Sequence, residues 1–270
     1  MRELQEKDIL FGAAYYPEYM PYDRLQEDIA MMQKAGMNTI RIAESTWSTL
    51  EPAEGVYDFS YIDKTLAAAE EAGMYVIIGT PTYAIPSWLE KKCPEVMVFD
   101  GYSRKKYGKR QIMDIVHPVF RKCAENVICK LLEHTANVSC VIGFQIDNET
   151  KHYGTASPQV QRMFVEYLKT KFHTTEQLNE VFGLRYWSNS ISDWSDFPDM
   201  AGCIHGGLAC EFAKFQRSLA AEYLVWQSEL VKKYKRQDQF ITHNFDFEWK
   251  KFGADIAQDG YSYGVQPDIN

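Results

Sequence analysis

Residues 140–149 read Cys-Val-Ile-Gly-Phe-Gln-Ile-Asp-Asn-Glu, a short and mostly apolar run that passes directly into three polar residues. Runs of this kind, rich in β-branched and aromatic residues, predict strands. In a parallel barrel the active site forms at the carboxyl ends of the strands, so polar residues directly after a strand are candidates for function. The stretch therefore indicates both a kind of fold and a place to look for a site.

Four more such runs predict strands over residues 11–16, 39–43, 75–79 and 240–245. Longer segments of helical period lie between them. The first two of these segments both end in Ala-Gly-Met, where Gly36 and Gly73 are placed to stop a helix. Strands that alternate with helices are typical of parallel βαβ units. We therefore expect an α/β fold of the (β/α)8 TIM-barrel type.

The length limits how much of a barrel we expect. A chain of 270 residues is close to the roughly 250 of one complete barrel. The five predicted strands extend to residue 245, however, which leaves 25 residues for three further units of roughly 30 each. We expect residues 1–270 to form a single domain, the N-terminal portion of a barrel with about its first five β/α units. The two open sheet edges would need cover from loops, self-association or a neighbouring chain.

Charge and hydropathy exclude several classes of partner. The formal net charge of −8 disfavours nucleic acid, because phosphate recognition needs clustered Lys and Arg. Residues 1–8 are highly charged with no apolar segment behind them, and no apolar run reaches 18 residues, so we expect no signal peptide and no membrane partner. The six cysteines form no CxxC pair, which favours reduced thiols. These features indicate a cytoplasmic protein.

Carboxylates, amides and aromatic residues follow the predicted strands. Such a mixture suits a carbohydrate, because aromatic rings stack on the apolar face of a sugar while polar groups bind its hydroxyls. The residues that follow the five strands are Tyr16-Pro17-Glu18, Glu44-Ser45-Thr46-Trp47, Thr80-Pro81-Thr82-Tyr83, Asp147-Asn148-Glu149 and Asn244-Phe245-Asp246.

Glu149 is the best single candidate for a catalytic residue. Glycoside hydrolysis needs two carboxyl groups, one of which donates a proton while the other remains ionised. Glu149 directly follows an apolar strand, and Asn148 beside it is placed to bind a sugar 2-hydroxyl. A helix N-cap with an acidic first turn explains the same Asp-Asn-Glu sequence equally well.

At this point the chain resembles the β-galactosidases of glycoside hydrolase family 42. The Trp-Ser…Leu-Glu-Pro…Gly-x-Tyr-Asp-Phe and Asp-Asn-Glu motifs together make the resemblance specific, and the matches cover nearly the whole chain. The matching stretches are 12–18, 41–52, 55–59, 80–82, 86–89, 145–149, 178–183 and 186–188.

The resemblance implies a retaining enzyme that cleaves terminal non-reducing β-D-galactosides, with Glu149 as general acid/base and Asn148 as a sugar ligand. Arg110 lies where the family has its substrate-side arginine, although a solvated loop charge is the alternative. Trp47 resembles a cleft-wall aromatic residue, although packing is as common a role there. Glu44 is expected to bind substrate from its place in the motif. The substrate would be a galactoside or galacto-oligosaccharide, and the full-length protein would be a homotrimer.

Two departures from the family matter. Many members hold a structural zinc with cysteines in two regions, which here read Arg110-Gln111-Ile112-Met113-Asp114 and Thr150-Lys151-His152-Tyr153-Gly154. Neither contains a thiol, so we predict no metal and no cofactor. The family's nucleophilic glutamate follows a later strand, and no glutamate follows Glu248 here. We therefore expect the nucleophile beyond residue 270.

Two alternatives remain open. The chain is inactive alone if it is a truncated fragment or a sugar-binding remnant, because one carboxyl group cannot carry out double displacement. An internal second carboxylate would change this, and Glu18, Glu44 and Asp246 are the positions to inspect. The second alternative is another retaining glycosidase of the same barrel clan, which a panel of nitrophenyl glycosides would distinguish.

Overall fold

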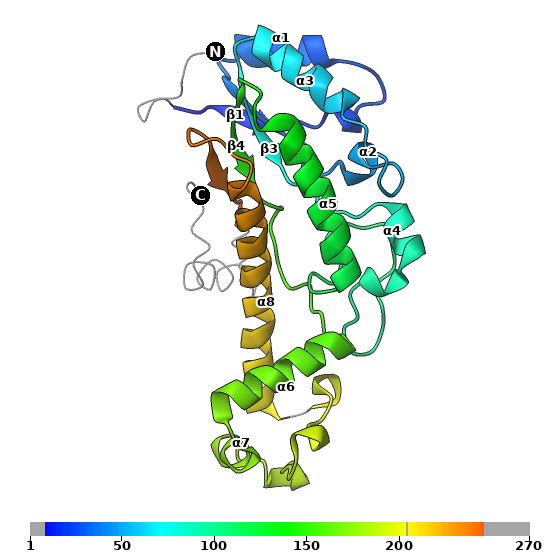
Figure 1. Cartoon of the computed structure of the whole chain (residues 1–270), viewed down its shortest axis with the longest axis vertical. Helices are drawn as coiled ribbons and strands as arrows, with labels where there is room; N and C mark the ends of the chain where they lie inside the picture. The colour runs from blue at the N-terminus through cyan, green and yellow to red at the C-terminus, as the bar shows by residue number, and fades with distance from the viewer. Residues whose placement is uncertain (1–8, 204, 246–270) are drawn as a thin grey trace.

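The computed structural model describes residues 9–203 and 205–245. Its centre is a sheet of five parallel strands in the order of the chain, each paired with the next (Figure 1). All five predicted strands are confirmed, most of them shorter than predicted. The strands are β1 (Gly12–Ala14), β2 (Thr39–Ile42), β3 (Tyr75–Gly79), β4 (Val141–Gln145) and β5 (Phe240–Thr242).

Helices connect the strands, as the periodicity predicts. The first two connections end as expected, because Gly36 and Gly73 both adopt positive φ just after α1 and α3. No helix in the described part of the chain is long and apolar enough to cross a membrane. The α-helices are α1 (Leu25–Lys34), α2 (Trp47–Leu50), α3 (Ser60–Glu71), α4 (Ser87–Lys92), α5 (Pro118–Thr135), α6 (Pro158–Phe172), α7 (Thr175–Phe182) and α8 (Gly206–Lys232). The 3-10 helices are η1 (Pro17–Tyr19), η2 (Pro94–Val96), η3 (Tyr186–Ser188), η4 (Trp194–Asp196) and η5 (Met200–Gly202).

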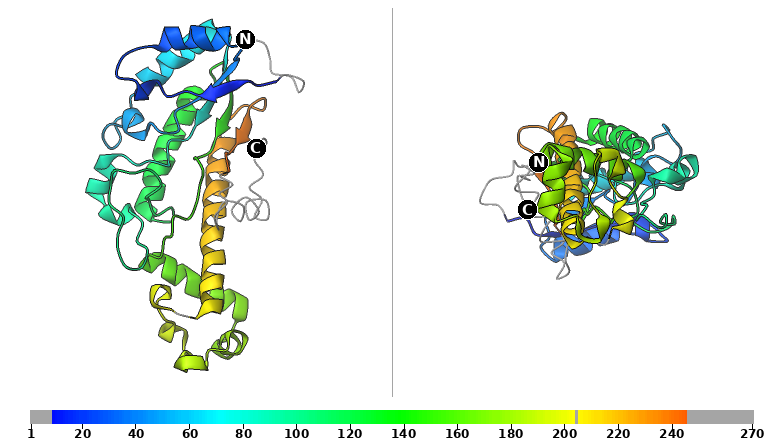
Figure 2. Two further views of the ribbon diagram at one scale, coloured as in Figure 1. Left: turned by 180° about the vertical axis from the view of Figure 1, so that it is seen from behind. Right: turned by 90° about the horizontal axis from the view of Figure 1, so that it is seen from below.

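The connection between β4 and β5 gives the molecule its elongated shape. It carries α6 and α7 away from the sheet, and α8 then returns along the length of the molecule to β5 (Figures 1 and 2). The 27 residues of α8 span about 40 Å at the usual helical rise. Aromatic packing fixes its distant end, where the Phe164 ring of α6 lies 5.0 Å from that of Phe212 and 5.4 Å from that of Phe215.

The sheet is curved, with its apolar outer face covered by helices. Every residue of β4 is buried, whereas the three residues of the edge strand β1 are exposed. Gly12 of β1 and Thr242 of β5 nevertheless line one cavity of about 480 Å³, together with residues of the strands between them. Edge strands that line a common cavity require the sheet to curl toward closure, as in part of a barrel.

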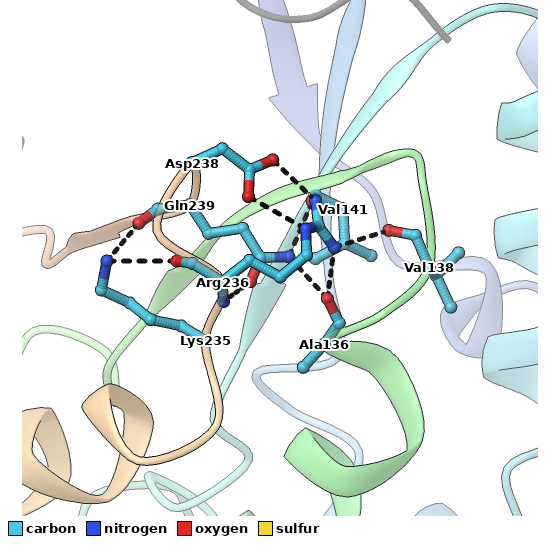
Figure 3. A network of polar contacts seen from close by, with 7 residues as sticks. All are labelled: Ala136, Val138, Val141, Lys235, Arg236, Asp238 and Gln239. Carbon is cyan, nitrogen blue, oxygen red and sulfur yellow. Dashed lines mark hydrogen bonds and ion pairs between the residues drawn. The ribbon is translucent and has the colours of Figure 1, made fainter.

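A polar network ties the amino end of β4 to the turn before β5 (Figure 3). Val141 O accepts hydrogen bonds from Arg236 Nη2 at 3.0 Å and from Gln239 Nε2 at 2.9 Å. Gln239 Nε2 also donates to Ala136 O, just beyond α5, at 2.9 Å, while Asp238 pairs with the Arg236 guanidinium. The network satisfies carbonyls that the helix end and the strand leave open.

The close approach of β3 to the segment after β2 gives a test of the fold. A Cβ at Gly79 would lie 2.6 Å from Glu44 Cβ, whereas at Gly202 it would meet no atom within 4 Å. We expect Gly79→Ala to lower the free energy of unfolding by about 1–3 kcal/mol, because overpacking forces the backbone to shift. Urea denaturation measures this, with Gly202→Ala as control. Equal stability of the two variants would contradict the close approach.

Candidate active site

The site centres on residues 147–149, hereafter the 147–149 turn, which directly follows β4. Asp147 and Glu149 both have φ of +47°, and the next helix, α6, begins only at Pro158. The alternative interpretation of this sequence as a helix N-cap is therefore wrong. Positive φ costs a non-glycine residue about 1–2 kcal/mol, so contacts from elsewhere in the molecule must hold the turn.

Hydrogen bonds fix the orientation of Asn148. Its Oδ1 accepts from Asn244 Nδ2 at 2.9 Å and lies 3.5 Å from Gln145 Nε2. Asn244, which follows β5, also accepts a bond from the Glu149 amide at 3.4 Å. Both bonds to the Asn148 side chain use its carbonyl oxygen, so its amino group is the part left to donate toward a ligand.

Arg110 lies beside Glu149, at the end of an exposed loop. Its Nη2 is 3.5 Å from Glu149 Oε2, the Arg110 side chain is 55% exposed and that of Glu149 is 31% exposed. The guanidinium also lies 5.7 Å from the ring centre of Tyr83. The structure thus brings Arg110, Asn148 and Glu149 together, and their individual roles remain predictions.

Gln111 is a site residue that the sequence analysis missed. Its Nε2 donates to Asn148 O at 3.2 Å and to Glu149 O at 3.0 Å. These bonds fasten the loop that carries Arg110 to the 147–149 turn. Its place directly after Arg110 was the available signal, but a glutamine that binds backbone oxygens leaves no pattern in a sequence.

Glu44 is completely buried at the end of β2. Its Oε1 accepts bonds from Tyr16 Oη at 2.7 Å and from Arg41 Nε at 3.0 Å, while its buried Oε2 has no partner among the described residues. Burial, followed by the bond to Glu44, raises the pKa of Tyr16 to about 12. The predicted substrate-binding role of Glu44 is untested, and in the described residues its contacts are with protein groups.

The prediction that Trp47 lines the cleft is wrong. Trp47 is only 1% exposed, and its Nε1 donates to Glu51 Oε2 at 2.8 Å. The ring packs edge-on against Trp88 at 6.5 Å and against Phe120 of α5 at 6.1 Å. Because α2 begins at Trp47 and packs on α5, the indole faces the core. Trp88 is partly buried, and its Nε1 donates to Glu51 O at 2.8 Å.

Two predictions about other groups stay open. In residues 9–203 and 205–245, no cluster of three or more His, Cys, Asp or Glu side chains could hold a metal ion, and the absence of zinc remains a prediction. Of the possible second carboxylates, Asp246 lies outside the described residues, as does Glu248. Glu18 accepts bonds from Ser45 Oγ at 2.9 Å and Tyr61 Oη at 3.1 Å.

The fold and the site together define a class of protein. The glutamate, the asparagine and the arginine lie at the carboxyl end of a curved parallel sheet, which is where enzymes of the barrel class carry their active sites. The family model described as β-galactosidase, that of glycoside hydrolase family 42, matches residues 14–260. The chain belongs to glycoside hydrolase family 42.

The curated relatives that the chain matches include β-galactosidases. The chain is 31% identical over 252 residues to "Beta-galactosidase BgaA" of a Thermus species and 30% identical over 252 residues to a β-galactosidase of Thermus thermophilus. Both alignments cover 87% of this chain and 38% of the relative. The chain therefore spans less than half the length of these curated relatives.

Solved structures confirm the α/β fold of the TIM-barrel type. A catalytic mutant of Gan42B, a family 42 β-galactosidase from G. stearothermophilus, superposes with a TM-score of 0.82 at 29% identity. It covers 89% of this chain, which in turn covers 36% of that structure. The β-galactosidase of Halorubrum lacusprofundi gives a TM-score of 0.83 at 25% identity and covers 93% of this chain, which covers 39% of it.

The buried His243, which lines the 480 Å³ cavity, gives a pH test of the structure. Its Nδ1 lies 2.6 Å from Ile146 O, and burial lowers the pKa of His243 to about 4. The unfolded chain takes up this proton near the usual pKa of about 6.5. Stability is therefore lost as the pH falls from 6.5 to 4, by at most about 1.4 kcal/mol per pH unit.

We expect His243→Asn to remove this pH-dependent part of the free energy of unfolding, because Asn can keep the bond to Ile146 O but does not titrate. The unfolding free energy of the parent minus that of the variant should shrink on acidification through this window, as measured by urea denaturation at several pH values. Groups common to both proteins cancel in the difference. A difference that does not change with pH would contradict the buried, neutral imidazole.

Proposed function

We propose that this chain is the N-terminal portion of the catalytic barrel of a β-galactosidase, with residues 1–270 as a single domain. The enzyme hydrolyses terminal non-reducing β-D-galactosides with retention of configuration. The observation that carries the proposal is the grouping of Arg110, Asn148 and Glu149 at the carboxyl end of β4, in a member of glycoside hydrolase family 42.

In this proposal Glu149 is the general acid/base. Its side chain is partly exposed and close to a cation, while its backbone is held by Gln111 and Asn244. It protonates the leaving oxygen in the first step and deprotonates water in the second. Asn148 and Arg110 bind sugar hydroxyls. The Gan42B structure, a catalytic mutant in which a glutamate is replaced by alanine, supports a catalytic glutamate in this family.

The second carboxylate, the nucleophile, lies in a later part of a longer protein in this proposal. Glu44 is buried against Arg41 and Tyr16, and Glu18 accepts bonds from two hydroxyl groups. Glu44 is completely buried, and both carboxylate oxygens of the exposed Glu18 already accept hydrogen bonds, so neither is free to attack an anomeric carbon. A retaining pair needs carboxyl groups about 5–5.5 Å apart. The 270-residue chain alone is therefore proposed to be inactive.

The proposal includes an oligomeric state, a cellular location and a substrate. The full-length protein is a homotrimer in the cytoplasm, and its substrate is a galactoside or galacto-oligosaccharide. The homotrimer and the choice of galactose rest on the family, and the cytoplasmic location rests on the six cysteines, which are free thiols.

Replacing Glu149 tests the acid/base role in the full-length protein that contains this chain. We expect Glu149→Gln to lower kcat for lactose by about 10²–10⁴-fold, because the leaving group needs a proton. The loss for nitrophenyl galactoside in the same galactosylation step is smaller, since nitrophenolate leaves without one. Steady-state kinetics on both substrates and galactose binding measure these effects.

The control for this variant is Glu54→Gln. Glu54 is an exposed glutamate paired with Lys92, far along the chain from the turn, and its replacement should leave both rates at the parent values. Hydrolysis of lactose by Glu149→Gln at the parent rate would overturn the assignment.

A second test uses the chain as it stands. Purified residues 1–270 should release no nitrophenol from nitrophenyl galactoside above the uncatalysed rate, because the nucleophile is missing. Heat-treated chain provides the baseline, and circular dichroism checks that the untreated sample is folded. Measurable turnover that disappears in Glu149→Gln would contradict the proposal and direct the search to Glu18 and Glu44.

A further inference from the structure

The 147–149 turn depends on Asp147, a buried carboxylate. Asp147 is 1% exposed, and its Oδ1 accepts a bond from Thr82 Oγ1 at 2.6 Å while its Oδ2 accepts one from Thr150. Its backbone amide donates to Thr80 Oγ1 at 2.6 Å. All of these partners are protein groups, so Asp147 holds the turn and is not placed to touch a substrate.

Two of the three threonines that bind Asp147, Thr80 and Thr82, are themselves bound by one side chain from α8. Gln227 Oε1 accepts from Thr80 Oγ1 at 2.6 Å, and Gln227 Nε2 donates to Thr82 Oγ1 at 2.8 Å. Gln227 is completely buried. A single amide thus holds the two threonines that join the end of β3 to the turn after β4, although it lies about eighty residues beyond the turn in the sequence.

The orientation of the Gln227 amide fixes which bonds Thr80 and Thr82 donate and which they accept. Each threonine hydroxyl has one hydrogen to donate. Because Gln227 Nε2 donates to Thr82, the hydrogen of Thr82 is available for the Asp147 carboxylate. Because Gln227 Oε1 accepts the hydrogen of Thr80, a lone pair of Thr80 is free for the Asp147 amide. With the amide reversed, Thr82 would spend its hydrogen on Gln227, and Asp147 Oδ1 would lose its donor.

We propose that Gln227 is a positioning residue for the active site, acting through Thr80, Thr82 and Asp147 to hold Glu149 in place for proton transfer. The inference rests on the proposed function for its kinetic consequence. Its structural part rests on the strained backbone of the turn and on the buried chain of hydrogen bonds. Both are observed independently of that function.

The surroundings of Asp147 explain why a neutral amide suits this position. Burial raises the pKa of Asp147 to about 6, and the other titratable groups that face it are the buried phenols of Tyr153 and Tyr223. The nearby Arg121 guanidinium lies 4.7 Å from the ring centre of Tyr223. A second carboxylate at position 227 would compete with Asp147 for the hydrogen of Thr82, whereas an amide supplies one donor and one acceptor.

The test uses the full-length protein with Gln227→Met, which keeps the length of the side chain and removes both hydrogen bonds. We expect kcat for lactose to fall about 10- to 100-fold, since small displacements of a catalytic group have effects of this size. KM should change by less than about threefold, and nitrophenyl galactoside should be affected less than lactose. This dependence on the leaving group identifies a misplaced acid, which a general loss of stability would not produce.

Gln239→Met is the matched control. Gln239 is also buried, and its side chain bonds to Ala136 O, Val141 O and the Arg236 amide, at the amino end of the sheet and away from the site (Figure 3). We expect it to lower the melting temperature about as much as Gln227→Met while kcat stays within about twofold of the parent. Equal kcat losses in the two variants would overturn the proposal.

Conservative replacement at Thr82 gives a second, independent variant. Thr82→Ser keeps the hydroxyl and should retain most of the activity, whereas Thr82→Val keeps the shape and should reproduce the kinetic pattern of Gln227→Met. The double variant Gln227→Met/Thr82→Val should be no worse than the poorer single variant, because both break one chain of bonds. Additive losses of kcat would contradict the proposal that Gln227 and Thr82 act through one chain of hydrogen bonds.

Hydrogen exchange separates this inference from the proposed function. In the full-length protein, Gln227→Met should speed amide exchange in peptides that cover the 147–149 turn, and Gln239→Met should not. This readout needs no activity. Unchanged exchange in Gln227→Met overturns the positioning role even in an active enzyme. An inactive parent, or a Glu149→Gln variant with full activity, overturns the proposed function instead.

Discussion

The structure depends on the need to satisfy polar groups that are buried where β3 and β4 end. Asp147, Thr80 and Thr82 are all out of contact with water, so each needs a protein partner. Gln227 supplies partners for both threonines. The chain leaves the sheet through α6 and α7, and α8 then returns Gln227 to these two threonines.

The interior of the curved sheet also buries polar groups, and there they are only partly satisfied by partners within the described residues. Gly79 lets Glu44 approach the backbone of β3, and Glu44 then accepts bonds from Arg41 and Tyr16. His243, after β5, is buried with its Nε2 unpartnered in the described residues. The inside of the sheet thus carries charged and polar side chains such as Arg41 and Gln145 beside the apolar Ile77.

Sequence reasoning located the strands and the rim residues, because apolar runs identify buried strands and parallel strands share one carboxyl edge. That edge brought Asn148 and Glu149 together with Asn244. The direction of Trp47 could not be predicted, since the packing of α2 on α5 decides it. Gln227 was also invisible, because one amide on a long helix has no periodic signature and its partners lie far away in the sequence.

The two halves of the proposed site differ in how firmly they are held. Asn148 and Glu149 sit on a strained turn between strand ends, fixed by a buried contact with Gln145 and by partly buried bonds to Asn244. Arg110 sits on an exposed loop, which Gln111 fastens to the 147–149 turn through its side chain and to Tyr83 O through its backbone amide. Proton transfer requires the rigid part, because catalytic geometry tolerates little displacement. Recognition of a sugar hydroxyl tolerates the looser part, because a long cationic side chain on a loop can adjust to its ligand.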